Sequence, residues 1–177
     1  MRLSHEFVVL DTALHDRDSF QCGKDELDNY IKAQAAKHMK AGISRTLVLT
    51  AKPEEPDSKS RICAFFSITP GSISRDTLPA VLAKKLPRYP VPVFLIAQLA
   101  VHEDFQGRGL GKITLIRSLE QLARIHAEMP AYAVVVDCVD NEAERFYSQY
   151  GFEFLCTHRG MSRLFIPMKT VLKLFEN

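Results

Sequence analysis

The sequence lacks the features that mark membrane and secreted proteins. No apolar stretch approaches the roughly 18 residues that a membrane-spanning helix needs. The opening segment MRLSHEFVVLDTALHD becomes acidic too early for a secretion signal. We therefore expect a cytoplasmic protein with no membrane partner.

Cysteine is scarce and scattered. The cysteines form no C-x-x-C pair, and no histidine stands at the spacing of a zinc ligand; they are Cys22, Cys63, Cys138 and Cys156. The sequence thus predicts neither a metal site nor a disulfide framework. The base rate for free cysteine favours buried or idle thiols over catalytic ones.

Charge of one sign is not in excess. Lysine and arginine number 23 against 21 aspartates and glutamates, a formal net charge of +2 that is too mild to require a nucleic-acid partner. Basic residues gather in two stretches, which contain Lys32, Lys37, Lys40 and Lys84, Lys85, Arg88. Charge alone favours a solvated face for both stretches.

With 177 residues, 46% of them hydrophobic, the chain is expected to form one globular domain over residues 1–177.

Hydrophobic periodicity predicts a mixture of helices and strands. In the first part of the chain, apolar residues recur every four positions in an amphipathic helix that Asp25 is expected to cap and Gly42 to end. Residues 46–51 and 62–69 are rich in β-branched and aromatic side chains and are predicted to form a hairpin around a polar loop. A short helix over residues 78–86 is expected in the proline-interrupted stretch that follows.

The centre of the chain predicts a strand–helix–strand unit. VFLIAQLAV (93–101) has almost no charge, which predicts a strand in the middle of a sheet, covered on both faces. Helical spacing over residues 111–127 and the apolar run at 133–139 predict a helix and a second buried strand, paired in parallel through a right-handed crossover. A helix over 141–151, closed by Gly151, and two more strands complete the expected α/β fold.

Three glycines lie between the buried strand and the long helix, in the stretch VHEDFQGRGLGKITL (101–115). The first N–H groups of a helix have no acceptor within the helix, and the helix dipole is positive at that end, so such a turn binds anions. Gly107, Gly109 and Gly111 carry no Cβ atoms that would keep a phosphate oxygen away. The alternative is a tight strand-to-helix turn with no ligand. A P-loop is excluded, because G-x-x-x-x-G-K-[ST] is absent.

Two motifs resemble those of the GNAT acyltransferase family. QGRGLG (106–111) is similar to the family's [QR]-x-x-G-x-[GA] signature and stands, as in the family, between the central strand and the long helix. FYSQYGF (146–152) is similar to its [LF]-Y-x-x-x-G-F motif. The resemblance implies the α/β GNAT fold, a mixed central β-sheet with a parallel β-α-β core flanked by helices.

The resemblance also implies acetyl-CoA as co-substrate and no metal. The pyrophosphate is expected on the N–H groups of residues 107–112. The pantetheine arm is expected beside the backbone of residues 99–101, where an N–H group could hold the oxyanion. The residues implied in cofactor binding are Leu99, Ala100, Val101, Gln106, Gly107, Arg108, Gly109, Leu110, Gly111, Lys112 and Phe146.

Tyr147 matches the position of the family's catalytic tyrosine, which implies a general acid that protonates the leaving thiolate. An amine can attack a thioester directly once the two are held together, so no covalent enzyme intermediate is required. Without the resemblance, a core aromatic residue is the better interpretation of Tyr147. Tyr150 is assigned to packing or to the cleft wall. No general base is assigned, because His102 and Glu103 can face solvent and water is an adequate substitute.

Further stretches resemble one branch of the family, the acetyltransferase toxins of bacterial toxin–antitoxin pairs. FQCGKDELDNYIKAQA (20–35) is similar to the branch's opening F-x-C-G-x-x-x-L-x-x-(F/Y/W)-(I/L), and shorter pieces lie at 42–49, 87–92 and 165–171. The resemblance implies acetylation of the α-amine of aminoacyl-tRNA, which blocks translation. It also implies a ribbon-helix-helix antitoxin and a homodimer. The basic residues then gain a role as phosphate contacts.

Two positions bear on the choice of branch. Residues 98–102 are QLAVH where the branch commonly has R-L-A-V-D, so backbone pairing with the cofactor is expected to survive while substrate contacts can differ. Asp140, where many GNAT enzymes have asparagine, fits the toxin branch. Two alternatives stay open. One is a GNAT enzyme for a small-molecule amine, a polyamine or a protein N-terminus. The other is a non-catalytic acyl-CoA-binding module, against which Tyr147 and the unbroken glycine loop argue.

Overall fold

The helices and strands follow the hydrophobic pattern of the sequence. The computed structural model describes residues 6–176; residues 1–5 and 177 of the predicted domain lie outside the described residues. In chain order the elements are β1 (Val8–Val9), β2 (His15–Asp16), α1 (Asp25–Asn29), the π-helix η1 (Tyr30–Gln34), α2 (Ala35–Lys40), β3 (Arg45–Thr50), β4 (Ser60–Ile73), the 3-10 helix η2 (Arg75–Thr77), α3 (Ala80–Ala83), β5 (Val91–Val101), the 3-10 helix η3 (Glu103–Phe105), α4 (Leu110–Glu128), β6 (Ala133–Cys138), α5 (Asn141–Ser148), β7 (Glu153–His158), β8 (Met161–Pro167) and α6 (Met168–Lys173).

Hydrogen bonding links the strands in the order β1-β3-β4-β5-β6-β8-β7, with the short β2 paired to β4. β3 is antiparallel to both β1 and β4, as the predicted hairpin requires. β5 and β6 run parallel, in register from Val93 with Ala133 to Ile96 with Val136. β8 is antiparallel to both β6 and β7. The mixed sheet and the parallel pairing predicted on either side of α4 are therefore confirmed.

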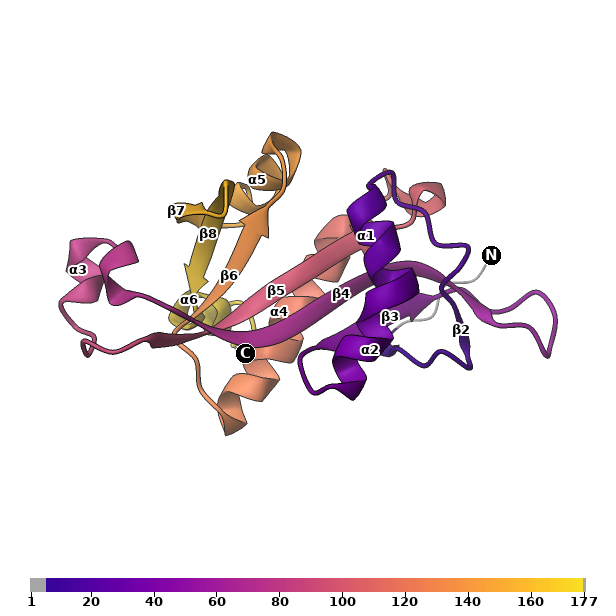
Figure 1. Cartoon of the computed structure of the whole chain (residues 1–177), viewed down its shortest axis with the longest axis horizontal. Coiled ribbons are helices and arrows are strands. Elements are labelled where there is room, and N and C mark those ends of the chain that lie inside the picture. Colours follow the sequence, from indigo (N-terminus) through magenta and orange to yellow (C-terminus); the bar gives the residue numbers. More distant parts are fainter. Residues whose placement is uncertain (1–5, 177) are drawn as a thin grey trace. The chain divides into compact units, whose positions relative to one another are not determined.

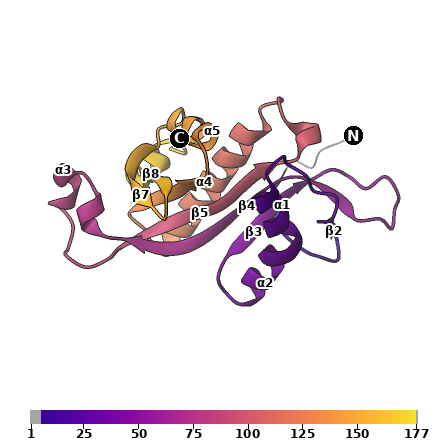
Figure 2. The same cartoon turned by 45° about the horizontal axis from the view of Figure 1, so that its top comes forward.

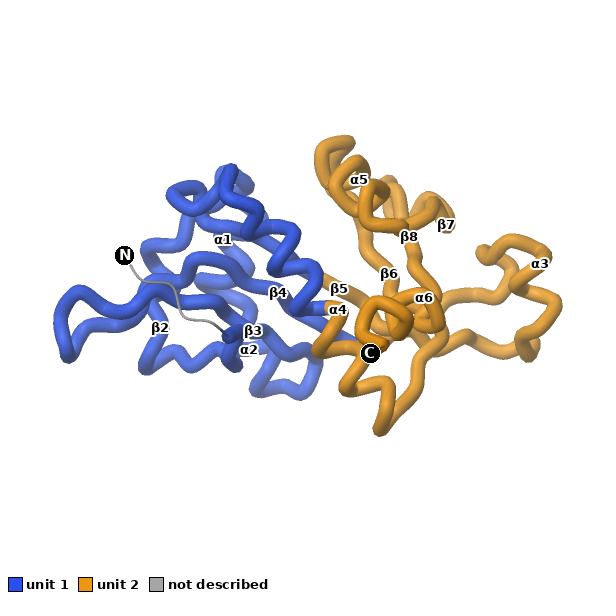
Figure 3. Tube along the Cα trace, turned by 180° about the vertical axis from the view of Figure 1, so that it is seen from behind, with its two compact units in different colours: residues 1–69, 98–118 blue, residues 70–97, 119–177 orange. Residues whose placement is uncertain are grey.

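The chain forms two compact units (Figure 3). Unit 1 comprises the described residues up to 69 together with residues 98–118, and unit 2 comprises residues 70–97 and the described residues from 119 onward. β4, β5 and α4 contribute residues to both units.

In unit 1 the helical segments α1, η1 and α2 lie over strands β3 and β4 (Figures 1 and 2). Tyr30 of η1 belongs to the same buried cluster as Val48 of β3. Leu49, the next residue, points to the opposite face of the strand. There it belongs to a second cluster, with Phe105 and with Leu110 at the start of α4. Both faces of β3 are thus buried.

The predicted amphipathic helix is present but is not one continuous α-helix. The π-helix η1 separates α1 from α2, and Lys24, the residue before α1, makes no side-chain capping bond. The prediction that Asp25 caps the helix is wrong, because Asp25 is its first residue; Asp28 instead accepts a hydrogen bond from the N–H of Cys22 at 2.9 Å. In an α-helix, side chains four residues apart do not lie exactly in line: each is rotated by about 40° around the helix axis from the one before. The π turn has more residues per turn, so it offsets part of this rotation and keeps the apolar side chains on one face. Gly42, with φ of 76°, follows α2 as predicted.

Unit 2 is built around β6 and β8, against which α5 and α6 pack. Its core cluster joins Val93 of β5, Ala133 of β6 and Phe165 of β8. α5 is followed by Gly151, whose φ of 95° confirms the predicted left-handed residue. None of the helices described between residues 6 and 176 is long and apolar enough to span a membrane.

The helix predicted over residues 78–86 is shorter in the structure. Pro79 forces the preceding Leu78 into extended backbone, with φ of −80° and ψ of 154°. The regular helix α3 begins only after Pro79, and the residues before Leu78 form the 3-10 turn η2.

Candidate functional site

The glycine stretch forms the turn between β5 and α4 in unit 1. Gly107 and Gly109 have φ angles of 77° and 76°, in the left-handed region where residues with a Cβ are strained. Nothing lies within 4 Å of the position that a Cβ would take at either glycine. α4 begins at Leu110, one residue earlier than predicted, so Gly111 lies in its first turn. The N–H groups of residues 110–112 therefore have no acceptor inside the helix, as an anion site requires.

The side chain of Gln106 holds this turn in place. Its Nε2 donates to the carbonyl of Val101 at 2.9 Å and to the carbonyl of Cys22 at 3.0 Å. The N–H of Glu103 donates to the carbonyl of Gln21 at 2.8 Å. These bonds fasten the loop to the end of β5 and to the segment before α1. Both amide hydrogens of Gln106 are used in this way, which leaves its side-chain oxygen for other contacts.

His102 is buried, which contradicts the expectation that it can face solvent. The residue is 4% exposed, and its ring lies edge-on to Phe20 and Phe105, with centroids 5.6 Å and 5.9 Å away. Its Nδ1 accepts a hydrogen bond from the N–H of Asp104 at 3.1 Å, and its Nε2 lies 3.2 Å from the carbonyl of Ser19. Nη2 of Arg61 lies 3.4 Å from the same Nε2. Both ring nitrogens are engaged within the protein, so His102 helps to position the loop.

Two arginines flank Phe105 at the loop. The guanidinium carbons of Arg61 and Arg108 lie 5.5 Å and 5.9 Å from the centroid of the Phe105 ring, within cation–π range. Arg61 also donates to Oδ2 of Asp104 at 2.7 Å, and this hydrogen bond holds the pKa of the Asp104 carboxyl below its ordinary range. Sequence reasoning missed Arg61, because it lies on β4, 43 residues before Asp104, and no local pattern points to it.

The end of β5 carries the backbone expected to pair with the cofactor. Ala100 belongs to the buried cluster under the first helices, and Val101 packs against the cluster of Leu110 on the opposite face. The N–H of His102 donates to the carbonyl of Cys63 on β4 at 2.8 Å. Within the described residues, the register of β5 with β6 ends at Ile96, so residues 99–101 lie beyond it.

Tyr147 lies on α5 and is 8% exposed. Its ring contacts those of Phe146 and Phe152, with centroids 5.1 Å and 5.4 Å away. Burial, and to a smaller extent the nearby Cys138, raises the pKa of Tyr147 well above its ordinary value. The hydroxyl is therefore protonated at neutral pH, as a general acid must be. The ring of Tyr150 lies 5.2 Å from that of Phe146, in agreement with the packing role assigned to Tyr150.

The elements around Tyr147 are fixed by two acidic residues. Oδ1 of Asp140 accepts a hydrogen bond from the N–H of Ala143 at 2.8 Å and so caps α5. On the neighbouring strands β6 and β8, Arg163 forms a bidentate salt bridge with Asp137. Its Nε lies 2.7 Å from Oδ1 and its Nη2 lies 2.8 Å from Oδ2. Sequence reasoning missed this pair, because it is created by the β6–β8 register.

The thiols have the character that the sequence predicted. Cys22, Cys63 and Cys138 are buried and Cys156 is half-buried. Burial raises the pKa of each of the first three thiols to about 11, so they are neutral and weakly nucleophilic at pH 7. Among residues 6–176, no group of three or more histidine, cysteine, aspartate or glutamate side chains is arranged to hold a metal ion.

The structure brings most of the predicted site residues together in unit 1. These are Leu99, Ala100, Val101, Gln106, Gly107, Arg108, Gly109, Leu110, Gly111 and Lys112. Phe146 and Tyr147 are in contact with each other in unit 2.

Comparison with known proteins identifies the chain's relatives. A family model described as an acetyltransferase (GNAT) domain matches residues 80–154, which include the glycine loop, all of α5 and the first two residues of β7. Over 138 residues the chain is 31% identical to the tRNA-acetylating toxin of Mycobacterium tuberculosis, with 78% of each protein covered. Over 173 residues it is 30% identical to the probable toxin TacT of Sinorhizobium fredii, with 93% of this chain and 92% of that protein covered.

Solved structures have the same fold. A mutant of KacT matches with a TM-score of 0.88 at 21% identity, over 99% of this chain and all of that one. AtaT complexed with acetyl-methionyl-tRNAfMet matches with a TM-score of 0.85 at 21% identity, over 99% and 100% of the two chains. A mutant AtaT toxin bound to the C-terminus of the antitoxin AtaR and acetyl-CoA matches with a TM-score of 0.79 at 18% identity, over 99% of both chains. The chain therefore belongs to the GNAT acetyltransferases, in the branch of the tRNA-acetylating toxins, and is an N-acetyltransferase with acetyl-CoA as its donor.

Proposed function

We propose that the protein is a toxin that acetylates the α-amine of aminoacyl-tRNA and so blocks translation. The observation that carries the proposal is the likeness, over most of both chains, to the tRNA-acetylating toxin of Mycobacterium tuberculosis. AtaT, which shares the fold, has been solved with acetyl-methionyl-tRNAfMet, an acetylated aminoacyl-tRNA. Acetylation removes the nucleophilic amine that peptide-bond formation requires.

We infer that the diphosphate of acetyl-CoA lies on the N–H groups of residues 107–112. The positive end of α4 and the open space beside Gly107 and Gly109 support this inference. The side chains of Arg108 and Lys112, at the loop and in the first turn of α4, add positive charge there.

The pantetheine arm is proposed to lie along the last residues of β5, like an added strand. Leu99, Ala100 and Val101 lie beyond the register with β6, and this supports a backbone edge that can pair with an amide-containing arm. Phe146, which contacts Tyr147, is proposed to contact the same molecule from α5.

The chain's own groups are proposed to act at two points. Acetyl-CoA supplies an activated acetyl group, because a thioester carbonyl accepts a neutral amine directly. A backbone N–H near residues 99–101 holds the negative charge that develops on the carbonyl oxygen. The protonated hydroxyl of Tyr147 donates to the leaving sulfur. Water takes the proton of the amine, because the ring nitrogens of His102 are occupied by Asp104 and Ser19.

The toxin assignment brings partners with it. We propose that the protein has an antitoxin of the ribbon-helix-helix type and forms a homodimer. The binding of AtaT by the C-terminus of the antitoxin AtaR supports an antitoxin partner. Both units are proposed to act as one acetyltransferase domain, because the family model spans residues of each. The proposed location is the cytoplasm, where aminoacyl-tRNA is made and used.

Induced expression in a bacterial host tests the proposal. The wild-type chain is expected to arrest growth and to leave N-acetylated aminoacyl-tRNA, whereas Tyr147→Phe is expected to do neither. Tyr150→Phe, in the turn that follows α5, is the matched control and is expected to keep both effects. Unimpaired growth and unmodified tRNA with the wild-type chain would shift the assignment to acetylation of a small-molecule amine, a polyamine or a protein N-terminus.

A further inference from the structure

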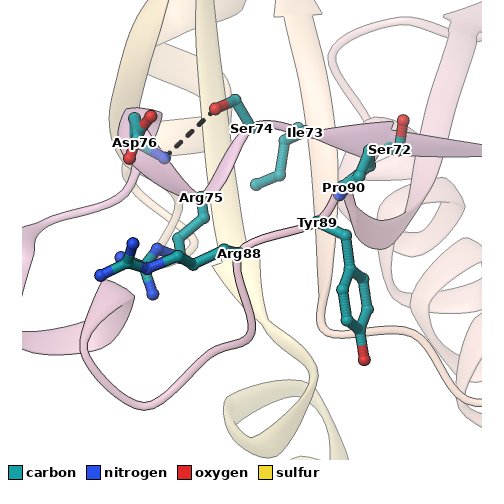
Figure 4. Close-up of a pocket in the computed structure, with 8 residues that line it drawn as sticks. All are labelled: Ser72, Ile73, Ser74, Arg75, Asp76, Arg88, Tyr89 and Pro90. Atoms are coloured by element: carbon teal, nitrogen blue, oxygen red, sulfur yellow. Dashed lines mark hydrogen bonds between the residues drawn. The ribbon is translucent and has the colours of Figure 1, made fainter.

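A cavity of about 470 Å³ lies in unit 2, between the end of β4 and the start of β5 (Figure 4). Its lining residues are Ser72, Ile73, Ser74, Arg75, Asp76, Arg88, Tyr89 and Pro90. They lie in neither the glycine loop nor the tyrosine motif. The cavity is therefore separate from the two acetyltransferase motifs.

Two arginines give the cavity its chemical character. Arg75 is held in place, because its Nη1 donates to the carbonyl of Leu86 at 2.8 Å. Arg88 is exposed and makes no hydrogen bond or ion pair with other residues in the range 6–176 that the structure describes. Both side chains extend in the same direction in Figure 4. A pair of guanidinium groups, one fixed and one without a protein acceptor, suits an oxyanion.

The lining is positively charged overall. Asp76 also lines the cavity, so two arginines and one aspartate leave a single positive charge. Two guanidinium groups can bind a phosphodiester, which carries one negative charge, or a free phosphate, which carries up to two near neutral pH. The features that favour a phosphate within a nucleic-acid backbone lie around the cavity.

The surroundings of the cavity favour a long ligand. Tyr89 is 68% exposed and offers an aromatic face on which a base can stack. Lys84 and Lys85, both exposed, continue the positive charge along the chain before Arg88. Pockets for small molecules are more enclosed and more apolar than this one.

We propose that this cavity binds a backbone phosphate of tRNA, with Arg75 and Arg88 as donors and Tyr89 as a stacking surface. The proposal rests on the proposed function for the choice of tRNA among nucleic acids. It assigns to unit 2 an RNA-binding site that lies outside both acetyltransferase motifs.

Binding of labelled, uncharged tRNA, followed by fluorescence anisotropy over a range of salt concentrations, tests the proposal. For each arginine–phosphate pair that is removed, the affinity for tRNA is expected to fall about eightfold at about 0.1 M salt, and the salt slope to fall by about one. Arg75→Gln/Arg88→Gln is expected to remove both pairs. Arg88→Gln alone breaks no bond described within the protein and is expected to remove one, so it distinguishes weaker RNA binding from misfolding.

The control is Lys169→Gln/Lys173→Gln, which removes the same charge from exposed residues of α6 that do not line the cavity. It is expected to change the tRNA affinity less than about threefold. An equal fall in affinity in the control variant would overturn the proposal in favour of diffuse charge, and unchanged affinity in the arginine variants would overturn it outright.

Titration with inorganic phosphate distinguishes the remaining source of the anion. Phosphate binding that the arginine variants lose while tRNA binding is unchanged would assign the cavity to a free phosphate and overturn the RNA site. The assay contains no acetyl-CoA, so it is independent of catalysis. A wild-type chain that binds tRNA through this cavity but acetylates none would refute the proposed function and leave the RNA site standing.

Discussion

At the scale of single residues, the loop at the start of α4 depends on backbone conformation and on one buried ring. Gly107 and Gly109 adopt positive φ angles that keep the turn open. His102 links Ser19 to the backbone of Asp104 and packs between two phenylalanines. The glycines are recognisable in the sequence because they lie in one short motif. The role of His102 is not, because Ser19 and Phe20 lie more than eighty residues away along the chain.

The requirement for glycine at residue 109 can be separated from its effect on stability. Gly109 and Gly42 both have a φ of 76° and open space around the Cβ position, so Gly109→Ala and Gly42→Ala carry a similar strain of about 1–2 kcal/mol. We expect equal losses of unfolding free energy, but weaker acetyl-CoA binding only in Gly109→Ala, measured by calorimetry. Equal acetyl-CoA affinity in the two variants would contradict the assignment of the loop.

The positioning role of His102 predicts a separation of kinetic parameters. His102→Ala leaves the N–H of Asp104 and the carbonyl of Ser19 without their partner, at a cost of about 1 kcal/mol for each bond. We expect a raised KM for acetyl-CoA with little change in kcat. His102→Asp, the residue common in the toxin branch, is expected to recover part of the loss by capping η3 again. A fall in kcat with an unchanged KM would instead indicate a direct catalytic role.

At the scale of elements, local patterns predicted the positions of most helices and strands. The apolar run of β5 and the helical spacing of α4 are properties of consecutive residues. The π-helix η1 was missed, because its hydrogen bonds depend on how the segment fits against β3 and β4. The pair formed by Asp137 and Arg163 was missed for a similar reason, since it is created by strand register.

The capping of α5 predicts a stability effect that is distinct from chemistry. Asp140→Ala removes the acceptor for the N–H of Ala143 and is expected to lower the unfolding free energy by about 1 kcal/mol. Asp140→Asn keeps an oxygen in the same place and is expected to lose much less. Asn141→Ala, at the next residue, serves as the control and is expected to stay within about 0.5 kcal/mol of the wild type. Urea unfolding measures all three, and an equal loss in the asparagine variant would show that the charge of Asp140 dominates over its cap.

At the scale of the whole molecule, the acetyltransferase assignment draws on both units. The glycine loop belongs to unit 1 and the tyrosine motif to unit 2. Each is recognisable in the sequence as a short motif of consecutive residues. The cavity of Arg75 and Arg88 was not predicted, because its lining comes together only through the path of the chain between β4 and β5. The sequence alone shows only that Arg88 belongs to a basic stretch, and it does not show that Arg75 lies beside it.

Buried thiols set an alkaline limit to the stability of the molecule. Burial raises the pKa of Cys22, Cys63 and Cys138 from 9.0 to about 11. Below about pH 8 nearly all of these thiols are protonated whether the chain is folded or not. Between about pH 9 and pH 11 the unfolded chain loses the protons and the folded chain keeps them, so stability falls as pH rises, by at most about 1.4 kcal/mol per pH unit for each thiol.

Urea unfolding at several pH values checks this limit. The contribution of these thiols to the free energy of unfolding is expected to stay constant up to about pH 8 and to decline above about pH 9. Cys63→Ala is expected to start lower, because it leaves a small cavity, but to decline less steeply. A decline as steep as that of the wild type would contradict the role of the Cys63 thiol.

The central claim is that this chain transfers the acetyl group of acetyl-CoA to the amine of an aminoacyl-tRNA. Its most direct test is to incubate the purified protein with acetyl-CoA and a mixture of charged tRNAs, and to measure N-acetylated aminoacyl-tRNA by mass spectrometry. We predict that the wild-type protein forms this product and that Tyr147→Phe forms far less while binding acetyl-CoA with unchanged affinity. Acetyl-CoA binding by the wild-type protein without any acetylated tRNA would contradict the account.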